Sequence, residues 1–393
     1  MAPVFGSAPA HPSTLLLRRL GERVQRLRGS AGPDPGPRAG WLQQPLDPFN
    51  SSDDRTFLQR YWVNDRHWAG GDAPVFLHLG GEGSLGPGSV MTGHPEALAP
   101  ALGALVISLE HRFYGLSVPA GGLGLAQLRY LSSRHAPGTA FTQGPVQPLS
   151  TWPQFSCHFP ARPRLWMVRD PAPVTSLDSQ EIEANSQMDH PQPLGSQVTR
   201  FPPCLPTDCT SSGWGQGLGP SSLGLRSECA ASRSQIVLHS LGQRCLSASR
   251  AQTVAQLKDT EPQASGLGDR QWLYQTCTEF GFYVTCENAE CPFPQFPALP
   301  SHLELCEQVF GLSASSVARA VTQTNSYYGG QAPGATRVLF VNGDIDPWHM
   351  LSVTQASGGS KAALLIPGAS HCADMAPERP SDPTSLRSGR KAS

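Results

Sequence analysis

Two aspartates and a histidine near the C-terminal end of the chain have the residue types and order that proton-transfer chemistry needs. Asp344 and Asp346 follow the apolar run Val338–Val341, and His371 follows the run Ala362–Ile366. Apolar runs of four or five residues that end at glycine are typical of buried strands. The pattern therefore predicts a parallel α/β unit that brings a carboxylate and an imidazole to the same edge of a sheet.

The pairing has a chemical reason. A neutral imidazole removes a proton from a hydroxyl nucleophile only when a carboxylate on its other nitrogen holds one tautomer and stabilises the imidazolium that forms. We favour Asp346 as that carboxylate, because Pro347 fixes the turn after it and Trp348 can shield the pair from water. The alternative is that Asp344 and Asp346 only cap the next helix and that His371 is an ordinary loop residue.

The stretch between the two strands, His349–Gln355, is long enough for a short helix. His349 lies close to Asp346 in the sequence, but it ranks below His371 as the base. In α/β-hydrolases the acid and then the histidine of the triad follow later strands of the sheet in this chain order. The order of the residues here is the same.

Length and composition allow either two or three domains or one large α/β domain with an insertion. The chain has 393 residues, a net charge of −1 and a sequence pI near 6.9, which gives no sign of nucleic acid or of an acidic membrane surface as a partner. No apolar run approaches the ~18 residues of a transmembrane helix. Neither a cofactor nor a metal is expected.

The ten cysteines suggest the secretory route. Cys286 and Cys291 bracket a short loop that a disulfide could close, whereas a zinc site would need a second such pair or nearby histidines. Asn50 begins a glycosylation sequon. The first twenty residues, however, contain no apolar core typical of a signal peptide. A missing or altered first segment is the simplest way to reconcile these signals.

Two further buried strands are predicted at Pro74–Leu79 and Ala104–Leu109, and a glycine-rich loop, Leu79–Ser89, follows the first. Such a loop can bring backbone N–H groups to a phosphate, although no Gly-Lys-Ser/Thr follows, as a P-loop would require. In α/β-hydrolases the corresponding loop gives one donor of the oxyanion hole. The candidate oxyanion and cleft residues of this loop are Gly81, Glu82 and Gly83.

Five motifs together resemble the prolyl carboxypeptidase / dipeptidyl peptidase II family of serine exopeptidases: GGEGS, EHRFYG, WLYQTCTEFGFY, NGDIDPWH and GASHCADM. The resemblance implies an α/β-hydrolase core with an inserted helical cap, cleavage of peptides near an end, and an endosomal or lysosomal location. It assigns the acid to Asp346 and the catalytic histidine to His371. Tyr274 and Glu279 are expected to line the substrate cleft.

The nucleophile of this family is missing from the pattern. The family's serine lies in a glycine-rich elbow after the EHRFYG motif, and no G-x-S-x-G occurs anywhere in this chain. His135–Ser232 stands at that place, with 14 prolines in 98 residues and no sustained period of 2 or 3.6. We therefore expect little or no activity. The alternatives are an inactive homologue that binds peptides and a truncated chain that does not fold.

The sequence predicts six segments: an N-terminal helix and linker (1–40), the first part of the hydrolase core (41–134), a non-globular segment (135–232), a remnant of the helical cap (233–268), the second part of the core (269–378) and a polar tail (379–393).

Overall fold

The structure is a computed structural model, and it describes residues 36–136, 249–262, 268–283, 285, 298–334, 338–355 and 361–392. The chain divides into two compact units, one of residues 1–25 and 192–250 and one of residues 26–191 and 251–393. Apart from Ser249 and Arg250, all described residues belong to the second unit. The predictions for the N-terminal helix, for Cys286 with Cys291 and for most of segment 135–232 lie outside the described residues.

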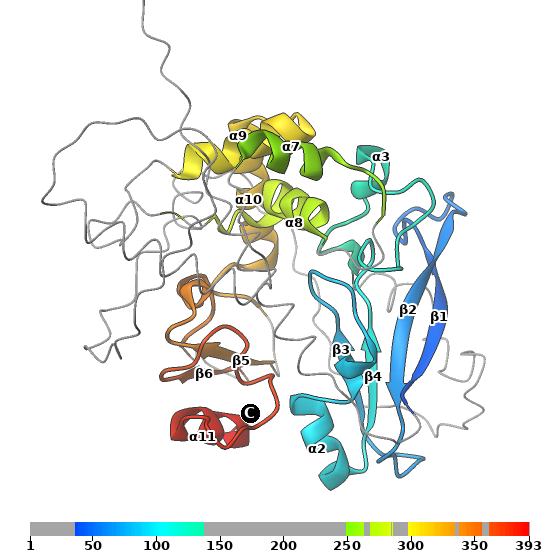
Figure 1. Ribbon diagram of the computed structural model, residues 1–393, viewed down its shortest axis with the longest axis vertical. Coiled ribbons are helices and arrows are strands. Elements are labelled where there is room, and N and C mark those ends of the chain that lie inside the picture. The colour runs from blue at the N-terminus through cyan, green and yellow to red at the C-terminus, as the bar shows by residue number, and fades with distance from the viewer. Residues whose placement is uncertain are drawn as a thin grey trace, which may run out of the picture. The chain divides into compact units, whose positions relative to one another are not determined.

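The first half of the core is a four-stranded sheet in the order β1-β2-β4-β3 (Figure 1). Its strands are β1 (Arg38–Pro45), β2 (Thr56–Asn64), β3 (Val75–Leu79) and β4 (Leu105–Leu109). β2 pairs antiparallel with β1 and β4, whereas β3 pairs parallel with β4. All five residues of β4 are buried, because this apolar strand lies between two others.

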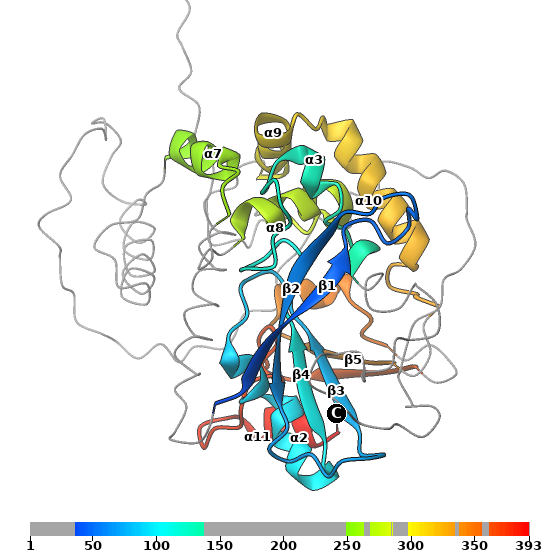
Figure 2. The ribbon, with the colours of Figure 1, turned by 90° about the vertical axis from the view of Figure 1, so that its right-hand side faces the viewer.

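The strands predicted at Pro74–Leu79 and Ala104–Leu109 are confirmed as β3 and β4. β1 begins at Arg38, inside the segment that we predicted as linker, because its first residues continue the antiparallel pairing as far as Val63 of β2. The connection from β3 to β4 contains η1 (Pro87–Val90) and α2 (His94–Leu102). Figure 2 shows α2 at one end of these strands.

The second half of the core contains β5 (Val338–Gly343) and β6 (Lys361–Ile366), which pair in parallel as predicted. The helix predicted at His349–Gln355 is instead a 3-10 helix, η4, at Pro347–Leu351. It begins earlier than predicted because Pro347 fixes the φ angle of its first turn and Asp346 caps it.

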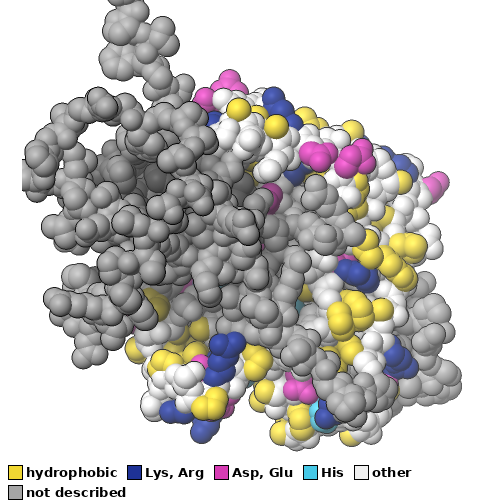
Figure 3. Space-filling view, viewed as in Figure 1, with side chains coloured by type: hydrophobic (Ala, Val, Ile, Leu, Met, Phe, Trp, Pro, Cys, Tyr) yellow, Lys and Arg dark blue, Asp and Glu magenta, His cyan; other side chains and the backbone are white. Residues whose placement is uncertain are grey.

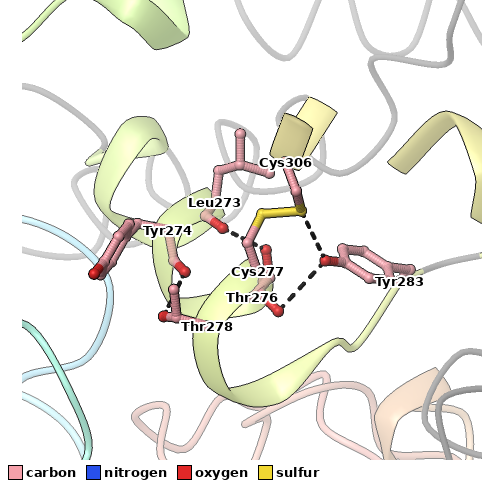
Figure 4. Close-up of a disulfide and its surroundings, with 7 residues drawn as sticks. All are labelled: Leu273, Tyr274, Thr276, Cys277, Thr278, Tyr283 and Cys306. Carbon is pink, nitrogen blue, oxygen red and sulfur yellow. Dashed lines mark hydrogen bonds between the residues drawn. A yellow bond between two sulfur atoms is a disulfide. The ribbon is translucent and has the colours of Figure 1, made fainter. Parts of the chain in front are cut away.

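The chain forms a group of helices between residues 250 and 328. This group contains a disulfide that the sequence did not predict. The helices are α7 (Arg250–Lys258), α8 (Asp269–Gln275), η3 (Thr276–Phe280), α9 (Ala298–Phe310) and α10 (Ala314–Tyr328). The Cys277–Cys306 disulfide joins η3 to α9, and the hydroxyl of Tyr283 lies 3.2 Å from the Cys306 sulfur (Figure 4). Buried side chains of η3, α9 and α10 form one core with Phe113, Tyr114 and Leu128 of the short helix α3 (Leu125–Leu128).

The last segment differs from the polar tail that we predicted at 379–393. Residues Thr384–Ala392 form helix α11, with Leu386 and Gly389 buried. Leu386 packs with Ile366 of β6, and Gly389 lies so close to Ile366 that a Cβ there would collide with it. One buried leucine and one close-packed glycine are too sparse a pattern to stand out among the polar residues of this helix.

The described residues thus form a mixed α/β fold whose strands lie in two separate sheets, β1-β2-β4-β3 and β5-β6. Within these residues no helix is both long and apolar enough to cross a membrane.

Candidate active site

Asp346 lies in the turn between β5 and η4, and its two carboxylate oxygens accept hydrogen bonds from two different partners. Its backbone is extended, and its Oδ1 accepts a hydrogen bond of 3.0 Å from the amide of Trp348, which caps η4. Its side chain is only 7% exposed. The cap uses one carboxylate oxygen and leaves Oδ2 for a second partner.

That second partner is His371, in the turn after β6. Nδ1 of His371 donates to Oδ2 of Asp346 over 2.7 Å, and the ring of Trp348 lies 5.2 Å from the imidazole, measured between centroids. The His371 side chain remains 56% exposed, and its Nε2 is not used by Asp346. This is the arrangement of carboxylate and base that acyl transfer requires.

The carboxylate changes the proton affinity of the imidazole. The hydrogen bond from Asp346 raises the pKa of His371 to about 10, and a contact with the Cys372 thiol adds to the rise against the opposing effect of burial. Cys372 is a free, exposed cysteine that takes a left-handed conformation, with φ at 53°. The raised pKa favours the protonated form of His371, whose positive charge the Asp346 carboxylate stabilises.

Asp344 has a different role from Asp346. Its Oδ1 accepts a 2.6 Å hydrogen bond from the amide of Gly368, so it ties the turn after β5 to the turn after β6. His349 donates through Nδ1 to the backbone oxygen of Asp346 over 2.6 Å and so supports the same loop. Asp344 and His349 thus bond to backbone atoms, whereas Asp346 bonds to the side chain of His371; the assignment of Asp346 and His371 as the catalytic acid and base stays a prediction.

The glycine-rich loop after β3 is held at both ends and open in the middle. The amide of Gly80 donates to the oxygen of Leu109 over 2.8 Å, and the amide of Gly83 donates to the oxygen of Gly81 over 3.1 Å. Gly81 and Glu82 are exposed, and a Cβ added to Gly81 would meet no atom within 4 Å. The Gly81 amide donates to no acceptor among the described residues.

Glu110 fixes the far end of this loop. Its side chain is fully buried, and its Oε1 accepts from Arg60 over 2.6 Å and from the amide of Leu85 over 3.0 Å. Its Oε2 accepts from the amide of Leu116 and from the hydroxyl of Ser117. The EHRFYG motif therefore supplies a carboxylate that positions the glycine-rich loop.

The two cleft candidates from the WLYQTCTEFGFY motif lie in the helical group. Both oxygens of Glu279 accept hydrogen bonds from the amide of Ser133, at 3.0 and 2.9 Å, and burial raises the pKa of Glu279. Tyr274 packs edge-to-face on Phe310, and burial raises its pKa as well. The structure thus brings Asp346 and His371 together and gives Glu279 and Tyr274 partners of their own.

A second serine–histidine pair escaped the sequence analysis. The hydroxyl of Ser132 lies 2.7 Å from Nδ1 of His135, and Nε2 of His135 lies 3.7 Å from Asp47. Burial is the main cause that lowers the pKa of His135 to about 4. Ser132 also accepts a 3.2 Å hydrogen bond from the amide of His135, which is the geometry of a helix cap. We therefore assign this pair to local structure.

Asn50 lies on an exposed turn, where its side-chain oxygen accepts a hydrogen bond from the amide of Ser52. No group of three or more metal-ligating side chains gathers anywhere in the part of the chain that the structure describes.

Comparison with known proteins agrees with the geometry. The chain matches the family described as serine carboxypeptidase S28 over residues 44–137 and 224–393, which is more than half of its length. The chain belongs to this family. Membership implies an α/β-hydrolase-like fold and a hydrolase acting on peptide bonds, in agreement with the resemblance identified from the five motifs.

Two full-length relatives support the same assignment. The chain is 51% identical to the thymus-specific serine protease of Mus musculus over 468 residues, covering 96% of the chain and 92% of the relative. It is also 51% identical to the thymus-specific serine protease of Homo sapiens, covering 96% of the chain and 91% of the relative. A more distant relative is the lysosomal Pro-X carboxypeptidase of Mus musculus, 36% identical over 98 residues, which cover 23% of the chain and 20% of the relative.

The comparisons also mark where this S28 chain departs from its family. The family match is interrupted at residues 138–223, inside the segment that we predicted to replace the nucleophile elbow. The comparison with the mouse protease extends over 468 residues, whereas the chain has 393, so at least 75 positions of it have no residue of this chain.

Proposed function

We propose that the chain has the scaffold of a serine exopeptidase that acts near the ends of peptides, with Asp346 as the acid and His371 as the base. The observation that carries this proposal is the 2.7 Å hydrogen bond between these two side chains, in a chain that belongs to a serine peptidase family. Nδ1 of His371 is bound to Asp346, so Nε2 is the atom that would exchange the proton with a nucleophile and a leaving group.

The reaction of such a site is acyl transfer in two steps. A serine hydroxyl attacks the scissile carbonyl, His371 takes the hydroxyl proton through Nε2, and the proton then passes to the leaving amine as the acyl–enzyme forms. Water repeats the sequence to release the acid. Asp346 stabilises the imidazolium through Nδ1, and the free amide of Gly81 is the group in the glycine-rich loop best suited to hold the oxyanion.

In this chain we expect little or no turnover. No serine of the G-x-S-x-G type is present, and the family match is interrupted where that serine would lie. In serine proteases the loss of the nucleophile lowers kcat by several orders of magnitude.

A second candidate function is peptide binding without hydrolysis, and the raised pKa of His371 favours it. An exposed imidazolium at His371 and the open amide of Gly81 are groups that attract a carboxylate, such as the C-terminus of a peptide. Saturable binding of peptides that are not cleaved would support this function over hydrolysis.

Fluorophosphonate labelling of the purified chain tests the hydrolytic proposal. We expect no labelling of the chain as it stands. We expect labelling when the corresponding segment of the mouse relative replaces residues 138–223, and its loss when this graft also carries His371→Ala. A folded graft that labels equally with and without His371→Ala would contradict the role of His371. Labelling of the ungrafted chain would show that another serine is activated, and Ser132 would be the first to map.

The secretory location is a separate proposal. Endosomes or lysosomes are expected from the relative named lysosomal Pro-X carboxypeptidase, and Asn50 is exposed as a glycosylation site must be. Expression in mammalian cells should give a chain whose mobility rises on treatment with an N-glycosidase, and Asn50→Gln should remove that change. A chain without N-glycan that stays in the cytosol would contradict the proposal.

A further inference from the structure

The outer edge of β3 ends the first sheet with apolar residues uncovered. β3 pairs only with β4 among the described strands, and the 3.0 Å hydrogen bond between Nδ1 of His78 and the hydroxyl of Ser108 is likewise made to β4. Leu77 and Leu79 are 37% and 52% exposed, whereas their pairing partners on β4, Ile107 and Leu109, are 2% and 6% exposed. At this edge of the described sheet, Leu77 and Leu79 therefore remain exposed.

The sequence of β3 gives this edge no protection against pairing. Natural edge strands avoid pairing by carrying charged residues or proline. β1, at the opposite edge, has Arg38 and Pro45, whereas β3 reads VFLHL and contains neither a proline nor a formally charged residue. A strand of this composition is typical of the interior of a sheet.

The second sheet shows the same feature. Within the part of the chain that the structure describes, β5 pairs with β6 alone, and Leu339 of β5 is exposed. Along the chain the family match is interrupted between β4 and β5, at 138–223, and at least 75 positions of the comparison with the mouse protease have no residue of this chain. The interruption thus lies, along the chain, between the strands of the first sheet and those of the second.

We propose that the free edge of β3 is a docking site for an extended segment of another polypeptide, of the kind that full-length relatives carry opposite residues 138–223. The segment adds a strand parallel to β3, and its backbone N–H and C=O groups pair with those that β3 leaves open. Alternate apolar side chains of the segment cover Leu77 and Leu79. A five-residue edge, about 17 Å long, is enough to pair with one ordinary strand.

Binding of peptides from the mouse relative tests the proposal directly. Overlapping fluorescein-labelled 15-residue peptides that span the residues of the mouse protease opposite the interruption are titrated with the purified full chain, and fluorescence anisotropy is measured. We expect one region of the series to bind saturably with a stoichiometry of one. N-methylation of alternate backbone amides in that peptide should abolish binding, because it removes the donors that β3 requires.

Variants locate the site. Leu77→Lys combined with Leu79→Lys, and Leu79→Lys alone, should each weaken binding at least tenfold. Leu58→Lys is the matched control, because Leu58 is an exposed leucine on β2, away from this edge, and binding should not change. If the double variant loses its native circular dichroism, the single variant and the N-methylated peptide decide the outcome.

Three results would overturn the proposal. Absence of binding to any peptide by a folded chain would mean that the edge accepts no strand. Binding that Leu79→Lys leaves unchanged would place the peptide elsewhere. A dimer of the chain that Leu79→Lys dissociates would assign the edge to a second copy. The assay measures binding alone, so its outcome is independent of whether the site can hydrolyse a peptide.

Discussion

Asp346 and Asp344 lie two residues apart in one turn, yet they hold different partners. Asp346 accepts from the imidazole of His371, whereas Asp344 accepts from the backbone amide of Gly368. The first bond is made to an ionisable ring and the second to an amide. Of the two aspartates, Asp346 is therefore the one that raises the pKa of His371. The two aspartates therefore form a natural pair of test and control.

The pKa of His371 should fall when Asp346 is replaced. In the native chain the pKa of His371 is about 10, and in Asp346→Asn it should return toward 6.5 because the stabilising carboxylate is gone. Asp344→Asn should leave it near 10. The measurement is an NMR titration of the imidazole resonances of each variant. A native value near 6.5, or equal effects of the two substitutions, would contradict the assignment.

The raised pKa of His371 also predicts how pH affects the free energy of unfolding. The folded-state pKa of His371 is raised above its unfolded value, so its contribution is fully present below about pH 6.5 and is lost as the pH rises through about 10. Urea unfolding at pH 6 and pH 10 should show a larger loss of stability for the native chain than for Asp346→Asn. Identical losses would mean that the pair makes no pH-dependent contribution.

Removal of the Cys277–Cys306 disulfide should destabilise the helical group. The two cysteines are 29 residues apart, and closing a loop of that size lowers the entropy of the unfolded chain by an amount worth about 3–4 kcal/mol. Replacement of both cysteines by alanine should lower the urea midpoint accordingly. Cys372→Ser is the control, since Cys372 is free and exposed and should change stability little. An unchanged midpoint in the double variant would contradict the expectation.

The sequence predicted the strands that carry Asp346 and His371 better than their surroundings, for physical reasons that particular residues show. The runs before Asp346 and His371 are short, apolar and bounded by glycine, so the strands and their loops follow from local patterns. The Cys277–Cys306 pairing could not be predicted, because a cysteine position says nothing about which distant cysteine it meets. Helix α11 was missed because its buried side chains are few and its remaining residues are polar.

Loss of the Glu110 charge should destabilise the fold more than loss of a carboxylate in an exposed ion pair. Glu110→Gln removes the fully buried charge that pairs with the partly exposed Arg60, and breaking a buried ion pair typically costs about 3–5 kcal/mol. The matched control is Asp65→Asn, which breaks the exposed pair of Arg38 and Asp65 and should cost less than about 1 kcal/mol. Urea unfolding followed by circular dichroism compares the two. Equal effects would show that burial of Glu110 does not decide its contribution.

Gly343 should be required for the geometry of the Asp346–His371 pair. A Cβ at Gly343 would collide with the carbonyl group of Ala369, two residues before His371, so the backbone that carries the imidazole would have to move. Gly343→Ala should therefore cost about 1–3 kcal/mol of stability and lower the pKa of His371, because its hydrogen bond to Asp346 lengthens. Gly334→Ala is the control, since a Cβ there meets no atom within 4 Å. Urea unfolding and imidazole titration measure both effects, and a Gly343→Ala chain with native stability and a His371 pKa near 10 would show that the two loops are not packed as closely as described.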